Sequence, residues 1–332
     1  MSKKLVSLFL ALALMLACVS AVAETATDTD LPVSKGSSEN QDNNVSPTWF
    51  AVNDMAGRRI TLNAPADRVV VMMPADAEIL NAIGAFETIV GVGMYCATPE
   101  ETAVMPGIDQ LPVVDSGYVT NVEQVLELNP QVVILTKMGH SEELVDSLAA
   151  GGVQVVVTDA QDLEGVYADI TLLGAVTGKN AEAEALIADM KQKFAAVSEK
   201  AGETGKTLYI EESPLQWGLW TAGKGTYMDD IAAICGLTNI FADVEGHKDV
   251  SEEQVLERNP DVIITMSMYY GEGDLPDAEI KNRAGWENVS AVRNDAVIYD
   301  PTNAVALPGP RLTDVAEMLL DAFTEEAAEP AA

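Results

Sequence analysis

The stretch NVEQVLELNPQVVILT at residues 121–136 returns as SEEQVLERNPDVIIT at residues 251–265, with a constant offset of 130 and no gap. Asn121 and Ser251 are favoured N-cap residues, and each precedes by three positions the Gln of a capping box. The Asn-Pro pair then ends the helix, because Pro cannot continue it and Asn tolerates the left-handed conformation. The apolar run that follows predicts a buried strand. Two such units so far apart predict two similar α/β lobes rather than a tandem array.

A second pattern is shared by the two halves. Residues 78–83 have a helical pattern that Gly84 ends, and the helix expected at 230–234 is followed in the same way by Gly236. The offset between these glycines is 152, so the spacing between the two patterns differs between the halves. We therefore interpret the halves as diverged lobes.

We predict an α/β fold with two Rossmann-like lobes, each built on a central, mostly parallel sheet, connected by a single long α-helix. Residues 181–200 have apolar side chains at helical spacing with no Gly or Pro, and such a helix extends about 30 Å, enough to bridge two lobes. The other predicted strands are 69–73, 89–92, 132–136, 153–158, 207–210, 262–265 and 296–299. Further predicted helices are 142–150, 163 to about 178, 280–286 and 312–323, with a hairpin turn at 54–58 and a loop at 74–76.

The N-terminus, residues 1–23, has the composition of an export signal: lysines, an apolar run too short to span a bilayer, then small residues. Cleavage after Ala23 and a lipoprotein-type cut before Cys18 both fit. We favour the first, because Met15 is unusual before a lipidated Cys. Both place the protein outside the cytoplasm. The segments expected next are a solvated tether at 24–47, an N-terminal lobe at 48–162, a helical region at 163–200, a C-terminal lobe at 201–325 and a frayed tail at 326–332.

The net charge argues against one class of function, nucleic-acid binding. The formal charge of −33 over 332 residues repels phosphate backbones and anionic headgroups, so we expect no nucleic-acid partner. Cys96 and Cys235 fall in different lobes, and we expect buried free thiols rather than a disulfide.

Catalytic motifs are absent from the sequence. The run Gly205-Lys206-Thr207 has Lys200 where a phosphate-binding loop needs Gly, and it precedes a strand instead of following one. The two histidines, His140 and His247, have no second ligand at metal-binding spacing, and there is no Gly-x-Ser-x-Gly motif. We predict a protein that is not an enzyme and has no intrinsic cofactor or metal.

Glu123 and Glu253 occupy the same position in the two copies. Singly, each is explained by helix-start electrostatics, which contribute about 0.3–1 kcal/mol. As a matched pair on two lobes they favour two-point docking on a pseudo-symmetric partner.

Residues 48–325 resemble the substrate-binding proteins of ABC importers for iron-siderophores, haem and vitamin B12, whose two lobes are joined by one long helix. The resemblance rests on the two copies, on Ala-Gly-Lys-Gly at 222–225, and on Pro-Gly-Pro-Arg at 308–311. It implies that Glu123 and Glu253 engage arginines of a membrane permease dimer. It also implies a ligand in the cleft between the lobes, held by loops at strand ends. The candidates at matching loops are Tyr95, Tyr118, Trp217, Trp220, His247 and Lys248, followed by Tyr269 and Arg311.

From this resemblance we expect a monomeric carrier that captures a ferric siderophore or similar iron chelate. Aromatic side chains suit a flat ring system, and Lys248 and Arg311 offset the negative charge of a ferric chelate. A corrinoid or haem is the alternative ligand, although vitamin B12 binders tend to have tryptophan at the positions held here by Gly117 or Tyr118 and by His247. The remaining rivals are an enzyme on a paired α/β scaffold, such as a chelatase-like protein, and an adhesion module without a small ligand.

Overall fold

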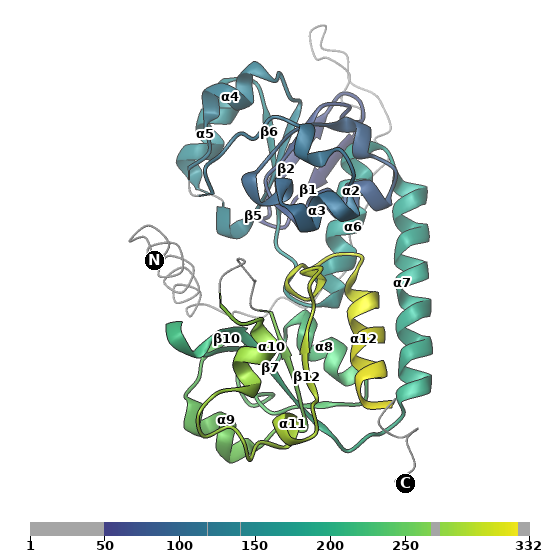
Figure 1. Cartoon of the computed structure of the whole chain (residues 1–332). Coiled ribbons are helices and arrows are strands. Elements are labelled where there is room, and N and C mark those ends of the chain that lie inside the picture. Colours follow the sequence, from purple (N-terminus) through teal and green to yellow (C-terminus); the bar gives the residue numbers. More distant parts are fainter. Residues whose placement is uncertain (1–49, 118, 140, 267–272, 325–332) are drawn as a thin grey trace, which may run out of the picture. The chain divides into compact units, whose positions relative to one another are not determined.

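The computed structural model describes residues 50–117, 119–139, 141–266 and 273–324 (Figure 1). They form two compact units, which we call the N-lobe, residues 50–196 with Pro301–Val315, and the C-lobe, Val197–Asp300 with the chain from Ala316. The long helix α7 (Asn180–Ala201) begins in the N-lobe and ends in the C-lobe. The predicted export signal, tether and tail lie outside the described residues. Among the residues that are described, no helix has the length and apolar character needed to cross a membrane.

The N-lobe is built on four parallel strands in the order β4-β3-β5-β6. Helices α4 and α5 cover one face of this sheet through Val125 and Leu148, and alternate strand residues such as Val71 are buried as well. The sheet is therefore covered on both faces, as a parallel sheet requires. Its elements are β3 (Val69–Val71), α2 (Pro74–Ala82), β4 (Ile89–Val92), α3 (Pro99–Val104), α4 (Val122–Glu127), β5 (Val132–Thr136), α5 (Glu142–Ala150), β6 (Gln154–Thr158) and α6 (Leu163–Thr177).

A hairpin of β1 (Phe50–Asn53) and β2 (Arg59–Leu62) is attached to the N-lobe sheet by its turn. The buried Asp54 carboxylate accepts hydrogen bonds from the backbone of Ala56 and Arg58 within the turn, and from the Val157 N–H of β6. This confirms the turn predicted at 54–58.

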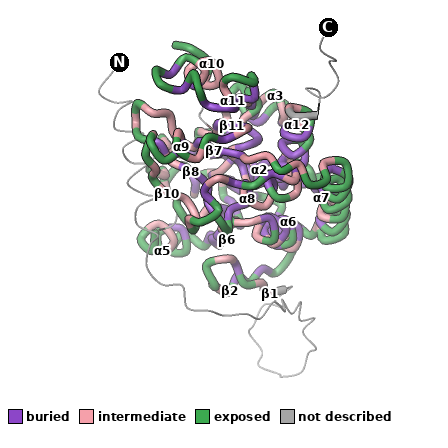
Figure 2. The backbone as a smooth tube through the Cα atoms, turned by 90° about the horizontal axis from the view of Figure 1, so that it is seen from below, coloured by how far each residue is buried: buried purple, intermediate pink, exposed green. Residues whose placement is uncertain are grey.

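The C-lobe repeats the strand order of the N-lobe. Strands β9, β7, β11 and β12 pair in parallel in the order β9-β7-β11-β12, and antiparallel β8 and β10 extend the sheet from the carboxyl half of β7. Figure 2 shows the burial of the central strands β7 and β11. The elements are β7 (Thr207–Ser213), β8 (Trp220–Ala222), α8 (Tyr227–Ile234), β9 (Thr238–Asn239), β10 (His247–Asp249), α9 (Glu252–Arg258), β11 (Val262–Thr265), α10 (Pro276–Lys281), α11 (Ser290–Arg293), β12 (Val297–Tyr299) and α12 (Leu312–Thr324).

The two copies of the repeated stretch fold alike at the level of single residues. Positions 121–130 and 251–260 have the same succession of exposed, intermediate and buried side chains. Each helix is followed by Asn in the left-handed conformation: Asn259, the C-cap of α9, has φ 43°, and Asn129, one residue past the α4 C-cap Leu128, has φ 48°. The second pattern is confirmed too, because Gly84 and Gly236 follow helices α2 and α8 with φ of 69° and 65°.

Several predicted boundaries are wrong, among them strand 207–210, which continues to Ser213, and the following two. Residues 74–76, expected as a loop, form the first turn of α2, because Pro74 supplies a residue whose fixed φ suits the first helical position. The helix expected at 280–286 is α10, which begins earlier at Pro276 and ends at Lys281. The following turn contains Gly285 at φ 91°, which ends the helical pattern.

Candidate functional site

Glu123 and Glu253 lie in the first turns of α4 and α9, and both side chains are exposed. The N-cap side chains of Asn121 and Ser251 each accept the N–H three residues on, at 3.2 Å. In the second copy Gln254 also accepts the Ser251 N–H at 2.9 Å, which completes the capping box. Both helices are therefore capped so that the matched carboxylate projects from their first turn.

The pKa of the Glu253 carboxyl is lowered, first because the group accepts a hydrogen bond from its own backbone N–H and then because it accepts one from Ser251. Hydrogen bonds to the charged form favour it. Glu253 is therefore a fixed negative charge at neutral pH, which suits a cationic partner.

The N-lobe places Tyr95 at the carboxyl end of β4, in the short 3-10 helix Met94–Ala97, where it is half-buried. The Asp115 carboxylate accepts hydrogen bonds from the Met94 and Gly117 N–H groups, so the loop before α4 is tied to this end of the sheet. A side chain at Gly117 would meet both Met94 and the Tyr95 hydroxyl. Tyr118 itself lies outside the described residues.

Exposed apolar side chains, which the sequence analysis did not single out, lie in the same group of loops. Met94 follows β4, Val119 precedes α4 and Met138 follows β5, and they are 40%, 68% and 58% exposed. Such exposed methionine and valine side chains offer an adaptable apolar surface. For Met94 and Met138 the signal in the sequence is a large apolar residue just beyond a buried strand, where solvent-facing loops are usually polar.

In the C-lobe, His247 and Trp220 share one face of neighbouring strands. His247 pairs with Ala222 and Asp249 with Trp220, so their side chains point to one side, whereas Lys248 pairs with Thr221 and points to the other. The structure therefore brings His247 and Trp220 together but separates Lys248 from them. Trp217 lies in the 3-10 helix between β7 and β8.

Glu212 is a polar partner of His247 that sequence reasoning missed. Its carboxylate lies 2.6 Å from His247 Nδ1, and its second oxygen is buried without a hydrogen-bond partner. Burial works to lower the pKa of His247, but the hydrogen bond and charge of Glu212 outweigh it and raise the pKa above its ordinary value. The two residues are 35 positions apart in the chain, so no local sequence motif predicts their contact.

Arg311 is engaged inside the N-lobe. Its guanidinium is paired with Glu78, donates to the Thr302 carbonyl at 2.8 Å and lies 3.6 Å from Glu101. That Arg311 contacts a ligand stays a prediction. Much of its positive charge is already offset by Glu78 and Glu101. Tyr269 and Cys18 lie outside the described residues.

The described residues contain no group of three or more His, Cys, Asp or Glu side chains that could hold a metal ion. Cys96 and Cys235 are buried free thiols, as predicted. Burial raises the pKa of Cys235 to about 12, so this thiol is not a reactive nucleophile at neutral pH.

Comparison with known proteins agrees with this architecture. The model of a family described as periplasmic binding protein matches residues 69–304. The chain is similar to the ABC transporter substrate-binding lipoprotein YvrC of Bacillus subtilis (strain 168), with 27% identity over 279 residues, 82% of this chain and 84% of the relative. It is 31% identical over 204 residues to the vitamin B12-binding protein of Salmonella typhimurium, which is 60% of this chain and 72% of the relative.

Among solved structures, the chain resembles a possible iron-binding (periplasmic solute-binding) protein from Staphylococcus epidermidis. The TM-score is 0.66 at 25% identity, with 79% of this chain and 100% of that one covered. The match includes both lobes of the fold, so the likeness is not confined to one Rossmann-like unit.

Proposed function

Because the chain belongs to the periplasmic binding protein family, we propose that it is the extracytoplasmic substrate-binding component of an ABC importer, with a metal chelate as its cargo. The observation that carries this proposal is the pair of exposed carboxylates, Glu123 and Glu253, one on each lobe, each in the first turn of a helix with a side-chain N-cap. The family is one of binding proteins, which argues against the enzyme alternative. An adhesion module without a small ligand has no use for two matched docking positions.

Among metal chelates, two observations favour a corrinoid over the ferric siderophore. Arg311, expected to offset the negative charge of a ferric chelate, is engaged by Glu78 and Glu101. The exposed apolar side chains Met94 and Val119 suit the broad face of a macrocycle. The 31% identity to a vitamin B12-binding protein supports the same choice. Haem and the ferric siderophore remain the alternative ligands.

Titration calorimetry of the purified protein with cyanocobalamin, haemin and a ferric hydroxamate tests this function. We expect saturable binding of cyanocobalamin and weaker or no binding of the other two. Tight binding of the ferric hydroxamate alone would reverse the order of ligands without changing the function. Failure to bind any of the three chelates would overturn the function.

The docking role has its own test with a matched control. We expect the double variant Glu123→Ala, Glu253→Ala to keep its ligand affinity but to lower importer-dependent uptake by about tenfold or more, as for buried interfacial charges. Glu127 and Glu257 lie at matched, exposed positions near the other ends of the same helices. Their double Ala variant should transport normally. Unchanged uptake by the first variant would mean that Glu123 and Glu253 only stabilise the starts of their helices and do not dock on the permease.

Export and anchoring also stay proposals, because residues 1–23 are outside the described residues. The lipoprotein description of YvrC now favours lipidation at Cys18 over cleavage after Ala23. The mass of the mature N-terminal peptide, with or without a diacylglyceryl group, decides between them.

A further inference from the structure

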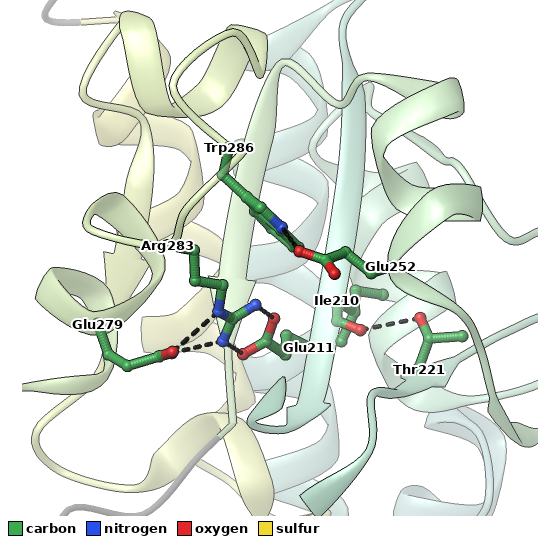
Figure 3. A network of polar contacts seen from close by, with 7 residues as sticks. All are labelled: Ile210, Glu211, Thr221, Glu252, Glu279, Arg283 and Trp286. Atoms are coloured by element: carbon green, nitrogen blue, oxygen red, sulfur yellow. Dashed lines mark hydrogen bonds and ion pairs between the residues drawn. The ribbon is translucent and has the colours of Figure 1, made fainter. Parts of the chain in front are cut away.

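A chain of polar contacts runs from the first turn of α9 to strand β7 inside the C-lobe (Figure 3). The indole N–H of Trp286 donates to Glu252 at 2.7 Å. The Trp286 ring lies 4.6 Å from the Arg283 guanidinium carbon, and Arg283 in turn makes two hydrogen bonds of 2.7 Å to the Glu211 carboxylate. Glu279 completes the set, with its carboxylate 3.0 Å from Arg283 Nε.

The middle of this chain is withdrawn from solvent, whereas the Glu279 side chain is 41% exposed and Glu252 is partly exposed. The Trp286 side chain is fully buried, and the side chains of Arg283 and Glu211 are 3% and 1% exposed. Buried ion pairs contribute little net stability, because desolvation offsets their attraction. They do fix the relative orientation of the two side chains, because a planar guanidinium–carboxylate contact allows one geometry. The end of the chain at Glu252 is therefore held in a fixed place.

The two copies of the docking helix differ at this point. The position of Glu252 in α9 corresponds to Val122 in α4, where the side chain packs against the N-lobe core. Apolar packing is non-directional, so it fixes how closely a helix lies but constrains its rotation weakly. A hydrogen bond at 2.7 Å requires alignment of donor and acceptor. The C-lobe therefore controls the orientation of its docking helix in a way that the N-lobe does not.

We propose that Glu252 is a positioning residue, held by the Trp286 indole, that fixes the orientation of α9 and so aims the neighbouring Glu253 carboxylate at the permease. The inference rests on the proposed docking role of Glu253. Glu252 and Glu253 are adjacent in the same turn, so a rotation of α9 that breaks the indole contact also displaces Glu253. Glu252 itself is only partly exposed, as expected for a side chain turned toward its own lobe.

Four variants test the positioning role. Glu252→Ala removes the acceptor, Glu252→Gln keeps an acceptor oxygen, and Trp286→Phe keeps an aromatic ring but removes the donor. Val122→Ala is the matched control in the other lobe. The first measurement is the carrier concentration that half-maximally stimulates the ATPase of the cognate permease in nanodiscs. We expect Glu252→Ala and Trp286→Phe to raise it by about three- to tenfold, the effect of one lost hydrogen bond.

The second measurement is the set of NMR residual dipolar couplings of the α9 backbone N–H groups, which report the orientation of the helix in each folded variant. We expect these couplings to change in Glu252→Ala and Trp286→Phe, and to stay as in the wild type in Glu252→Gln and Val122→Ala. Ligand affinity should be unchanged in all four variants. Because this measurement needs no permease, it tests positioning even if Glu253 has no docking role.

Two results would overturn the proposal. A docking defect in Glu252→Ala without one in Trp286→Phe would mean that Glu252 contacts the permease itself. Unchanged α9 couplings in both variants would mean that the indole contact does not orient α9. A wild-type carrier that neither binds a chelate nor stimulates the permease would instead count against the proposed function.

Discussion

Arg311 lies beside two acidic side chains that are almost fully buried in the N-lobe. Its guanidinium is paired with Glu78 and lies 3.6 Å from Glu101, and these residues are 3% and 1% exposed. Burial, and then the charge of Glu78, raise the pKa of Glu101 to about 8, while Arg311 acts in the opposite direction. Without Arg311, two buried carboxyl groups would face each other with no counter-charge.

We therefore expect Arg311→Ala to lower the free energy of unfolding by about 3 kcal/mol, the cost of breaking a buried ion pair from one side. Urea denaturation with an unchanged m-value is the measurement. Lys193→Ala is the control, because it breaks an exposed pair with Asp189 and should cost less than about 1 kcal/mol. If Arg311→Ala is as mild as the control but weakens ligand binding, Arg311 serves the ligand rather than the fold.

At the scale of the element, the two Asn-Pro helix ends differ in one respect. Asn129 and Asn259 both have a positive φ, but the Asn259 side chain also bonds to the hydroxyl and the N–H of Ser290, at 2.9 and 2.8 Å. Gly relieves the left-handed conformation in both helices, yet only at Asn259 does it remove these two bonds. We expect Asn259→Gly to cost about 1–2 kcal/mol and Asn129→Gly close to nothing. Equal thermal denaturation curves for the two variants would contradict this.

The helix ends also show what the sequence could predict. Caps and stops act within four residues, so α5 was placed at 142–150 without error, and α4 and α9 end at Glu127 and Arg258, close to the Asn expected to stop each of them. Strands β8 and β10 were missed, because three-residue strands have no periodic pattern and depend on pairing, β8 with β7 and β10 with β8. The partners Glu212 and Trp286 were also missed, because their contacts depend on the tertiary fold and not on a local pattern. Their contacts to His247 and Glu252 join residues 35 and 34 positions apart.

At the scale of the whole molecule, three buried carboxyl groups of the N-lobe link stability to pH. Burial raises the pKa of Asp76 to about 7 and that of Asp169 to about 8, in the second case helped by the charge of Asp76. Glu101 is raised to about 8. The Thr158 hydroxyl donates to Asp76, whereas one oxygen of Asp169 is buried without a partner. These groups keep their protons in the folded protein at a pH where the unfolded chain has lost them.

A raised pKa in the folded state stabilises the protein below the unfolded value, and this stabilisation is lost as the pH rises through the folded value. The free energy of unfolding should therefore fall between about pH 4 and pH 8, by about 1.4 kcal/mol per pH unit for each retained proton. The formal charge of −33 adds general repulsion, but the exposed carboxylates that cause it are ionised well below neutrality, so it does not explain a fall near pH 7.

Asp169→Asn isolates one of the three groups. Asn can accept the backbone N–H bonds of Asp159 and Ala160 as the carboxyl group does, and it cannot ionise. In urea denaturation we expect this variant to match the wild type near about pH 5 and to exceed it in stability near about pH 9, because the wild type must there ionise a buried group. Glu143→Gln removes the same charge from an exposed position and should leave the pH dependence unchanged. If both variants flatten the profile equally, general repulsion across the molecule governs its stability, and the buried carboxyl groups do not.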